Sequence, residues 1–72
     1  MIYNIWVEGF IINGSHAYAS YVGFMEGKDF RDAVIKWYNK HPGRALNFNE
    51  KYLTDWGCRL YPTESEVRRI FG

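Results

Sequence analysis

The sequence contains a single cysteine, Cys58, so no disulfide can form within the chain. A chain without a disulfide framework suits a reducing compartment. No apolar run approaches the roughly 20 residues that a membrane-spanning helix needs, and the longest candidate is Phe10–Ile12. The first residues also lack the charged, apolar and small-residue pattern of a secretory signal. We therefore expect a cytoplasmic protein that does not associate with membranes.

Charge of one sign is lacking as well. Nine Lys and Arg residues stand against eight Asp and Glu residues, for a net charge of +1. Proteins held on nucleic acid by bulk electrostatics carry a clear basic excess. Nucleic acid is therefore an unexpected partner for this chain.

Catalytic and ligand-binding motifs are also absent. A nucleophilic Cys58 would need a neighbouring base, and neither His16 nor His41 has a spacing that indicates a dyad. One cysteine and two separated histidines do not form a metal-ligand pattern, and no glycine-rich segment joins a strand to a helix to hold phosphate. Glu8 and Asp55, on predicted neighbouring strands, are better explained as solvated or paired carboxylates than as catalytic ones. We expect no enzyme activity, no metal and no cofactor.

What the chain has in excess is aromatic rings. Phe, Trp and Tyr make up 19% of its 72 residues. A domain of this size buries only about 60% of its unfolded surface, and each ring needs roughly 150–250 Å² of cover. Some rings must therefore lie on the surface, where protein interfaces favour them.

Strands are predicted on both sides of one clear helix. Residues 3–9 alternate as a strand, with Asn4, Trp6 and Glu8 on one side. The turn signal Asn13-Gly14-Ser15 leads into a second strand over about 17–25. Small residues on one side of that strand, Gly23 among them, indicate a helix packed closely against it.

The helix is predicted over residues 30–39. Asp29 is a favourable N-cap, and Pro42 cannot continue the helix. The helical phase places five residues on its buried face: Phe30, Ala33, Val34, Trp37 and Tyr38.

The remainder of the chain predicts two further elements. Residues 43–55 read as irregular, with a short helical turn at about 49–53. Residues 56–61 read as a third strand with Trp56, Cys58 and Leu60 on one face. A capping box at 63–66 then begins a short C-terminal helix with a narrow apolar stripe. That stripe consists of Val67, Ile70 and Phe71.

Together these elements predict a single α+β domain spanning residues 1–72, in the order β-β-α-β-α. A hairpin, followed by a right-handed crossover through the helix, gives a three-stranded antiparallel sheet of order 2-1-3. The main helix covers one face. The other face stays open unless the terminal helix, the long loop or a partner covers it.

Two segments give a family resemblance. One is 55–61, Asp-Trp-Gly-Cys-Arg-Leu-Tyr, followed by the closing Arg-Ile-Phe-Gly of 69–72; the other is 5–10, Ile-Trp-Val-Glu-Gly-Phe. With Gly14, Ala17, Ala19 and Gly23 they resemble a family of small proteins encoded by phages and prophages of Gram-positive bacteria. The resemblance implies a bacterial host cytoplasm and a host protein, such as one of a defence system, as partner. It transfers no functional residues.

The function expected from the residues is binding through exposed rings. A protein-interaction module, which closes its open face on a host protein or on a second copy, agrees with the aromatic excess and the balanced charge. Single-stranded nucleic-acid binding, with bases stacked on the sheet, is the alternative. The alternative reading of the rings is that they form a roof over the second face of the sheet. The candidate partner-binding residues are Trp6, Tyr21, Tyr52, Arg59 and Tyr61.

Overall fold

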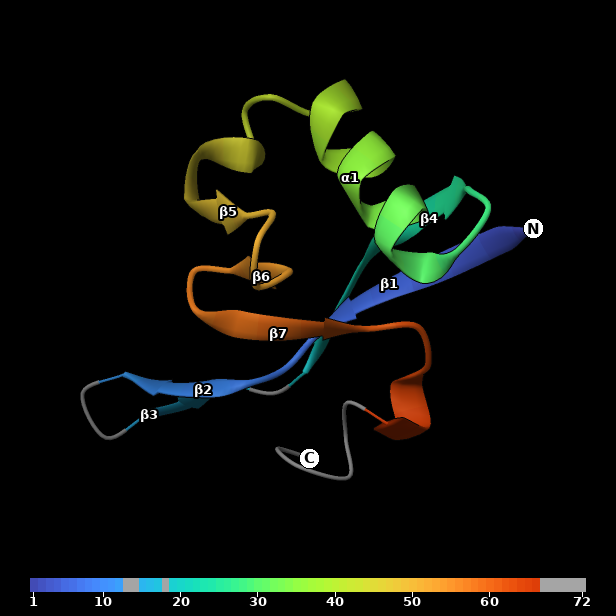
Figure 1. Ribbon diagram of the computed structural model, residues 1–72. Helices are drawn as coiled ribbons and strands as arrows, with labels where there is room; N and C mark the ends of the chain where they lie inside the picture. Colours follow the sequence, from blue (N-terminus) through green and yellow to red (C-terminus); the bar gives the residue numbers. More distant parts are fainter. Residues whose placement is uncertain (13–14, 18, 67–72) are drawn as a thin grey trace.

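The described part of the domain has one main helix packed on one face of a curled antiparallel sheet (Figure 1). The computed structural model describes residues 1–12, 15–17 and 19–66, and for 10–12 and 15–17 it describes the backbone alone. In chain order the elements are β1 (Ile2–Val7), β2 (Phe10–Ile12), β3 (Ser15–Ala17), β4 (Ser20–Glu26), α1 (Phe30–Lys40), a 3₁₀ turn (Ala45–Asn47), β5 (Phe48–Asn49), β6 (Thr54–Asp55) and β7 (Cys58–Tyr61).

The main sheet has the strand order β4-β1-β7-β6-β5, with every neighbouring pair antiparallel. Its first three strands confirm the predicted order 2-1-3. The prediction of three strands was wrong, because the segment read as irregular contributes β5 and β6. These strands pair through Phe48 with Asp55 and Asn49 with Thr54.

The helix α1 forms as its sequence predicts. The Asp29 side chain accepts a hydrogen bond from the amide of Asp32 at 2.8 Å and so caps the first turn. The buried face of the helix packs on Ile5 of β1 and Leu60 of β7, which join it in one core cluster. In the part of the chain that the structure describes, no helix is long and apolar enough to cross a bilayer.

A bulge in β4 changes which side chains face α1. Ile5 pairs with Gly23 but Trp6 pairs with Tyr21, so β4 carries one extra residue at this point. Val22 packs against the core cluster although simple alternation places it on the other face. The close approach expected at Gly23 is confirmed, since a Cβ there would lie 2.5 Å from Nε1 of Trp37.

The predicted third strand begins two residues late. Trp56 and Gly57 have φ angles of 56° and 79° and form a two-residue turn between β6 and β7, with Asp55 opposite Cys58. Trp56 therefore leaves the face that Cys58 and Leu60 share, and its placement on that face was wrong. The turn expected at 49–53 is present as a hydrogen-bonded turn over 50–53, where Oδ1 of Asn49 accepts from the Tyr52 amide at 3.0 Å, and a separate 3₁₀ turn lies earlier, at Ala45–Asn47.

Two regions extend from this body. β2 and β3 pair as a separate ribbon with Ile12 opposite Ser15, and Figure 1 shows it projecting beyond the end of β1. The predicted Asn13-Gly14 turn lies outside the described residues. After β7, the hydroxyl of Thr63 accepts a hydrogen bond from the amide of Glu66 at 3.2 Å, which confirms that half of the capping box. The apolar stripe predicted at residues 67–71 also lies outside the described residues.

Candidate interaction surface

The side of the sheet opposite α1 carries side chains from three adjacent strands, and we call it the outer face. Directly opposed residues of an antiparallel pair point to the same side of a sheet. The pairings of Trp6 with Tyr21 and Tyr61, and of Asn4 with Phe24, therefore place these side chains together. The outer face consists of Ile2, Asn4, Trp6, Tyr21, Phe24, Glu26, Arg59 and Tyr61.

Contacts between its side chains hold the centre of the outer face in place. The rings of Trp6 and Tyr21 meet edge to face, with centroids 5.1 Å apart. The Tyr21 hydroxyl donates a hydrogen bond to Oδ1 of Asn4 at 3.0 Å. Tyr21 nevertheless stays 46% exposed, and Phe24 at the edge stays 62% exposed. The rings of the outer face are therefore held in defined orientations and are still accessible to solvent.

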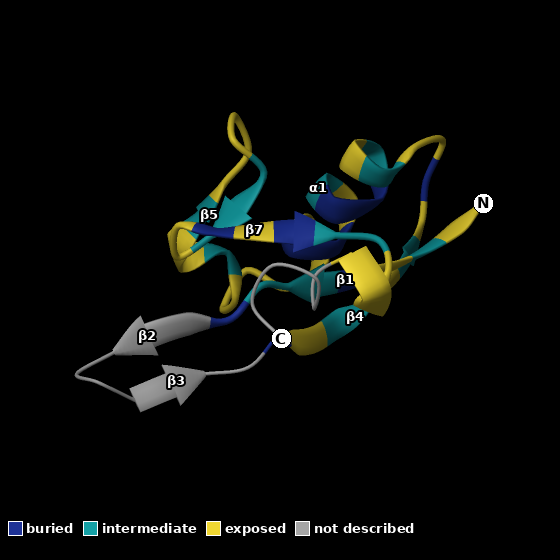
Figure 2. Ribbon diagram, turned by 90° about the horizontal axis from the view of Figure 1, so that it is seen from below, coloured by how far each residue is buried: buried dark blue, intermediate teal, exposed yellow. Residues whose placement is uncertain are grey.

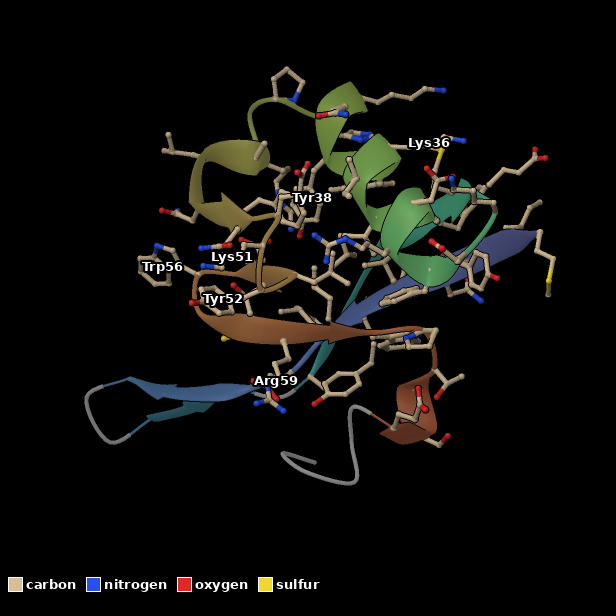
Figure 3. All side chains as sticks on the ribbon, viewed as in Figure 1. Lys36, Tyr38, Lys51, Tyr52, Trp56 and Arg59 are labelled. Atoms are coloured by element: carbon tan, nitrogen blue, oxygen red, sulfur yellow. The ribbon has the colours of Figure 1, made fainter. Side chains whose placement is uncertain are left out.

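Arg59 lies at the border of the outer face. Figure 3 shows it on the side of β7 away from α1, as its alternation with the buried Cys58 and Leu60 requires. Its amide donates to Oε1 of Glu8 at 2.9 Å, and its carbonyl accepts from the Glu8 amide at 3.0 Å. The Glu8 carboxylate is therefore bound to the backbone of Arg59 at this border, and the outer face is not strongly basic.

Four of the five predicted binding residues come together in this way, and Tyr52 does not. It lies between β5 and β6, at the other end of the sheet, where its ring is 67% exposed. The Lys51 ammonium sits 5.4 Å from the centroid of that ring. Figure 3 shows Lys51, Tyr52 and Trp56 at this end, apart from Arg59. Tyr52 is not part of the outer face.

Two exposed aromatic residues were missed by sequence reasoning. Phe24 was not named, although alternation from the helix-facing Gly23 places it on the outer face, as its pairing with Asn4 confirms. Trp56 was assigned to a buried strand face but is 64% exposed in a turn with positive φ. Gly57 directly after it was the available signal, since X-Gly marks such turns. A non-glycine residue in this conformation costs about 1–2 kcal/mol.

The groups that could carry chemistry are held by the core. Cys58 is buried beside Leu60, as predicted, and burial raises the pKa of its thiol, with further contributions from the charges of Glu8 and Asp55. A raised pKa leaves little thiolate at neutral pH. Asp55 accepts a hydrogen bond from the Tyr38 hydroxyl at 2.6 Å, so Asp55 and Glu8 serve separate partners.

Tyr38 is the most important of these buried groups for the fold. Its ring stacks on Phe48, with centroids 4.1 Å apart and planes 4° from parallel. Burial is the first cause that raises its pKa, and the hydrogen bond to Asp55 adds to it. The hydroxyl thus remains a neutral donor that ties α1 to β6.

Histidine and carboxylate groups do not assemble into a metal site among the side chains that the structure describes, those of residues 1–9 and 19–66. His41 stacks on Trp37 with ring centroids 4.0 Å apart, and its Nδ1 lies 2.7 Å from the Trp37 carbonyl oxygen. The carbonyl can only accept, so Nδ1 must be the donor. The ring stacking and this hydrogen bond hold His41 against the last turn of α1.

Comparison with known proteins found no match among protein-family models, curated proteins or solved structures. The resemblance to phage and prophage proteins therefore stays a prediction from the sequence.

Proposed function

We propose that this domain is a protein-interaction module that binds its partner through the outer face. The observation that carries the proposal is the aromatic surface of β4, β1 and β7 on the side that α1 leaves uncovered. Figure 2, seen from below the view of Figure 1, draws β4 in the colours of exposed and half-buried residues. Aromatic side chains are the residues that most often dominate binding energy at protein interfaces.

The centre and the edge of the outer face have different roles in this proposal. Trp6 is half-buried and fixed against Tyr21, so little conformational freedom is lost when a partner covers them. Phe24 is largely exposed and offers a ring for a pocket on the partner. Arg59 at the border adds a hydrogen-bond donor of the type that interfaces favour.

Single-stranded nucleic acid is the second candidate, and the rings beside Arg59 are the observation that favours it. Its weakness is charge. Glu8 lies at the same border as Arg59, and the whole chain carries a net charge of only +1. A backbone of phosphates needs several cations along its track. Protein is therefore the better-supported partner.

The partner that the resemblance implies is a protein of the bacterial host, and a second copy of this chain is the alternative. One set of variants tests binding to a host protein and binding to a second copy. Tyr21→Ser and Phe24→Ser together remove two exposed rings of the outer face. Tyr52→Ser is the matched control, because its ring is exposed to a similar degree but lies elsewhere.

The experiment captures proteins from a Gram-positive lysate on the wild-type chain and on each variant, with quantitative mass spectrometry of what is retained. Sedimentation of the purified chain tests self-association in parallel. We expect the double variant to bind at least about tenfold more weakly, as loss of a hot spot implies, and Tyr52→Ser to bind as wild type does. The proposal would be refuted if the purified chain sediments as a monomer and if every protein that the wild-type chain retains is also retained by the Tyr21→Ser, Phe24→Ser variant. Selective retention of nucleic acid would favour the second candidate.

A further inference from the structure

The strand β4 has one edge that no other strand of the described residues pairs with. It forms one end of the strand order β4-β1-β7-β6-β5. Seven residues is long for an unpaired edge, and such an edge is a template for a further strand. The bulge at residues 21–23 interrupts its first half, so the regular part is the stretch that ends at Glu26.

The backbone groups that this edge offers follow from the hydrogen bonds to β1. Gly27 and Met1 exchange two bonds, from Gly27 N to Met1 O at 2.9 Å and from Met1 N to Gly27 O at 3.3 Å. Bonded and non-bonded pairs alternate in an antiparallel ladder. Met25 therefore points its amide and carbonyl at β1, whereas Phe24 and Glu26 point theirs outward.

A shallow depression accompanies this edge on the side of α1. It runs from the end of β4 at Met25 and Glu26 to a flank of the helix, and its charged lining residues are Glu26, Lys28, Asp32, Lys36 and Lys40. Arg31, on the other flank, donates to the carbonyl of Glu50. Figure 3 shows Lys36 on the part of α1 that lies toward β4. The depression is thus separate from the outer face.

The depression is positive on balance. The Asp32 carboxylate accepts from the Lys28 amide at 3.0 Å and from Nζ of Lys36 at 3.1 Å, and these bonds lower its pKa. The lining thus carries three ammonium groups, those of Lys28, Lys36 and Lys40, against the two carboxylates of Asp32 and Glu26. Glu26 also borders the depression, but its pairing with Ile2 places its side chain on the outer face.

We propose that the edge of β4 from Phe24 to Glu26, together with this lysine-lined depression, binds an extended peptide in which acidic and apolar residues alternate. Such a peptide would add a strand to the sheet through the outward groups of Phe24 and Glu26. Its alternate side chains would point to opposite faces. The acidic set would meet the lysines, and the apolar set would lie beside the exposed Phe24 ring.

A second copy of this chain fits the depression less well. If β4 of another molecule paired with this edge, its side chains toward the helices would come from Val22, Gly23 and Met25. None of these carries a carboxylate for the lysines. The charge of the depression therefore favours an acidic strand from a different polypeptide.

The test is an NMR titration of the isotope-labelled full chain with a short capped peptide in which Val and Glu alternate. We expect chemical-shift changes and slower hydrogen exchange at the amides of Phe24 and Glu26. The Met25 amide, already bonded to β1, should show no further protection. A peptide with Lys in place of Glu is the matched control and should bind at least about tenfold more weakly, because each exposed ion pair contributes roughly two- to fivefold.

Two pairs of variants separate the backbone from the charge. Glu26→Pro removes only an outward N–H, which an edge strand tolerates, and should weaken binding by roughly two- to tenfold, as loss of one hydrogen bond implies. Glu26→Gln should not weaken it. Lys40→Gln should weaken binding roughly two- to fivefold, while Lys51→Gln, outside the depression, should not. Thermal unfolding of each variant shows that it is folded.

Four results would overturn this proposal. The first is absence of any shift at millimolar peptide, and the second is equal affinity for the Glu and Lys peptides. The third is a response at outer-face residues such as Trp6 without slower hydrogen exchange at the Phe24 and Glu26 amides. The fourth is protection of Phe24 and Glu26 that rises with protein concentration alone, which would assign the edge to a second copy. The outer-face proposal shares Phe24 with this one but is tested by Tyr21→Ser with Phe24→Ser, whereas Glu26→Pro and Lys40→Gln test the peptide edge, so the two proposals can fail independently.

Discussion

Replacing Gly23 with alanine tests how closely α1 packs on β4, and therefore which face of the sheet is open. A Cβ at this position would lie 2.5 Å from Nε1 and 3.0 Å from Cε2 of Trp37. Ordinary contact would require the indole to retreat by roughly 1 Å. Trp37 cannot do so freely, because it is 7% exposed and lies between His41 and the guanidinium of Arg44.

We expect Gly23→Ala to lower the free energy of unfolding by about 1–3 kcal/mol, the usual cost of overpacking. In a domain of this size each kcal/mol lowers Tm by about 4–8 °C. Gly43→Ala is the matched control, since nothing lies within 4 Å of a Cβ there. Trp37→Phe removes the nitrogen that makes the closest contact, so Gly23→Ala should cost less in that background. Calorimetry that shows equal stability for Gly23→Ala and Gly43→Ala would refute the packing described above.

Two further substitutions test the elements that fix the outer face. Tyr38→Phe should lower the free energy of unfolding by about 1–2 kcal/mol in denaturant titrations, because Asp55 loses its donor; no loss would contradict this link between α1 and β6. Burial raises the pKa of Tyr38, so as the pH rises the unfolded chain releases the Tyr38 proton before the folded chain does. The stability of the wild-type chain should therefore be full below about pH 10 and fall above it. The fall should be smaller in Tyr38→Phe. Asp29→Ala should cost about 0.5–2 kcal/mol through loss of the N-cap, and a variant as stable as wild type would show that the Asp29–Asp32 bond contributes nothing.

The helix and the central sheet order could be predicted because local rules govern them. The apolar phase from Phe30 to Tyr38, with Asp29 before it and Pro42 after it, defines α1 without any tertiary information. The crossover rule then places β7 beside β1. These two steps predict which side of the sheet the helix covers.

The remaining features depend on contacts between residues distant in sequence. β5 and β6 have two residues each, too few for a periodic pattern, and they are held by pairings with β7 and by the Tyr38–Asp55 bond. The bulge in β4 leaves no mark in the sequence, yet it decides that Phe24 lies with Tyr21 on the outer face. Four residues of the candidate site were thus predicted from the sequence, and Phe24 on the edge strand was missed. The predicted residues are Trp6, Tyr21, Arg59 and Tyr61.

The central claim is that the rings of the outer face are left for another molecule. Relaxation of ring protons by a soluble nitroxide, measured by NMR on the purified monomer, tests it most directly. We expect strong relaxation at Phe24 and Tyr21, at the level of the exposed Tyr52, and little at the buried Trp37. Protection of Phe24 and Tyr21 equal to that of Trp37 would show that the chain covers this face itself, and the proposed interaction surface would then be refuted.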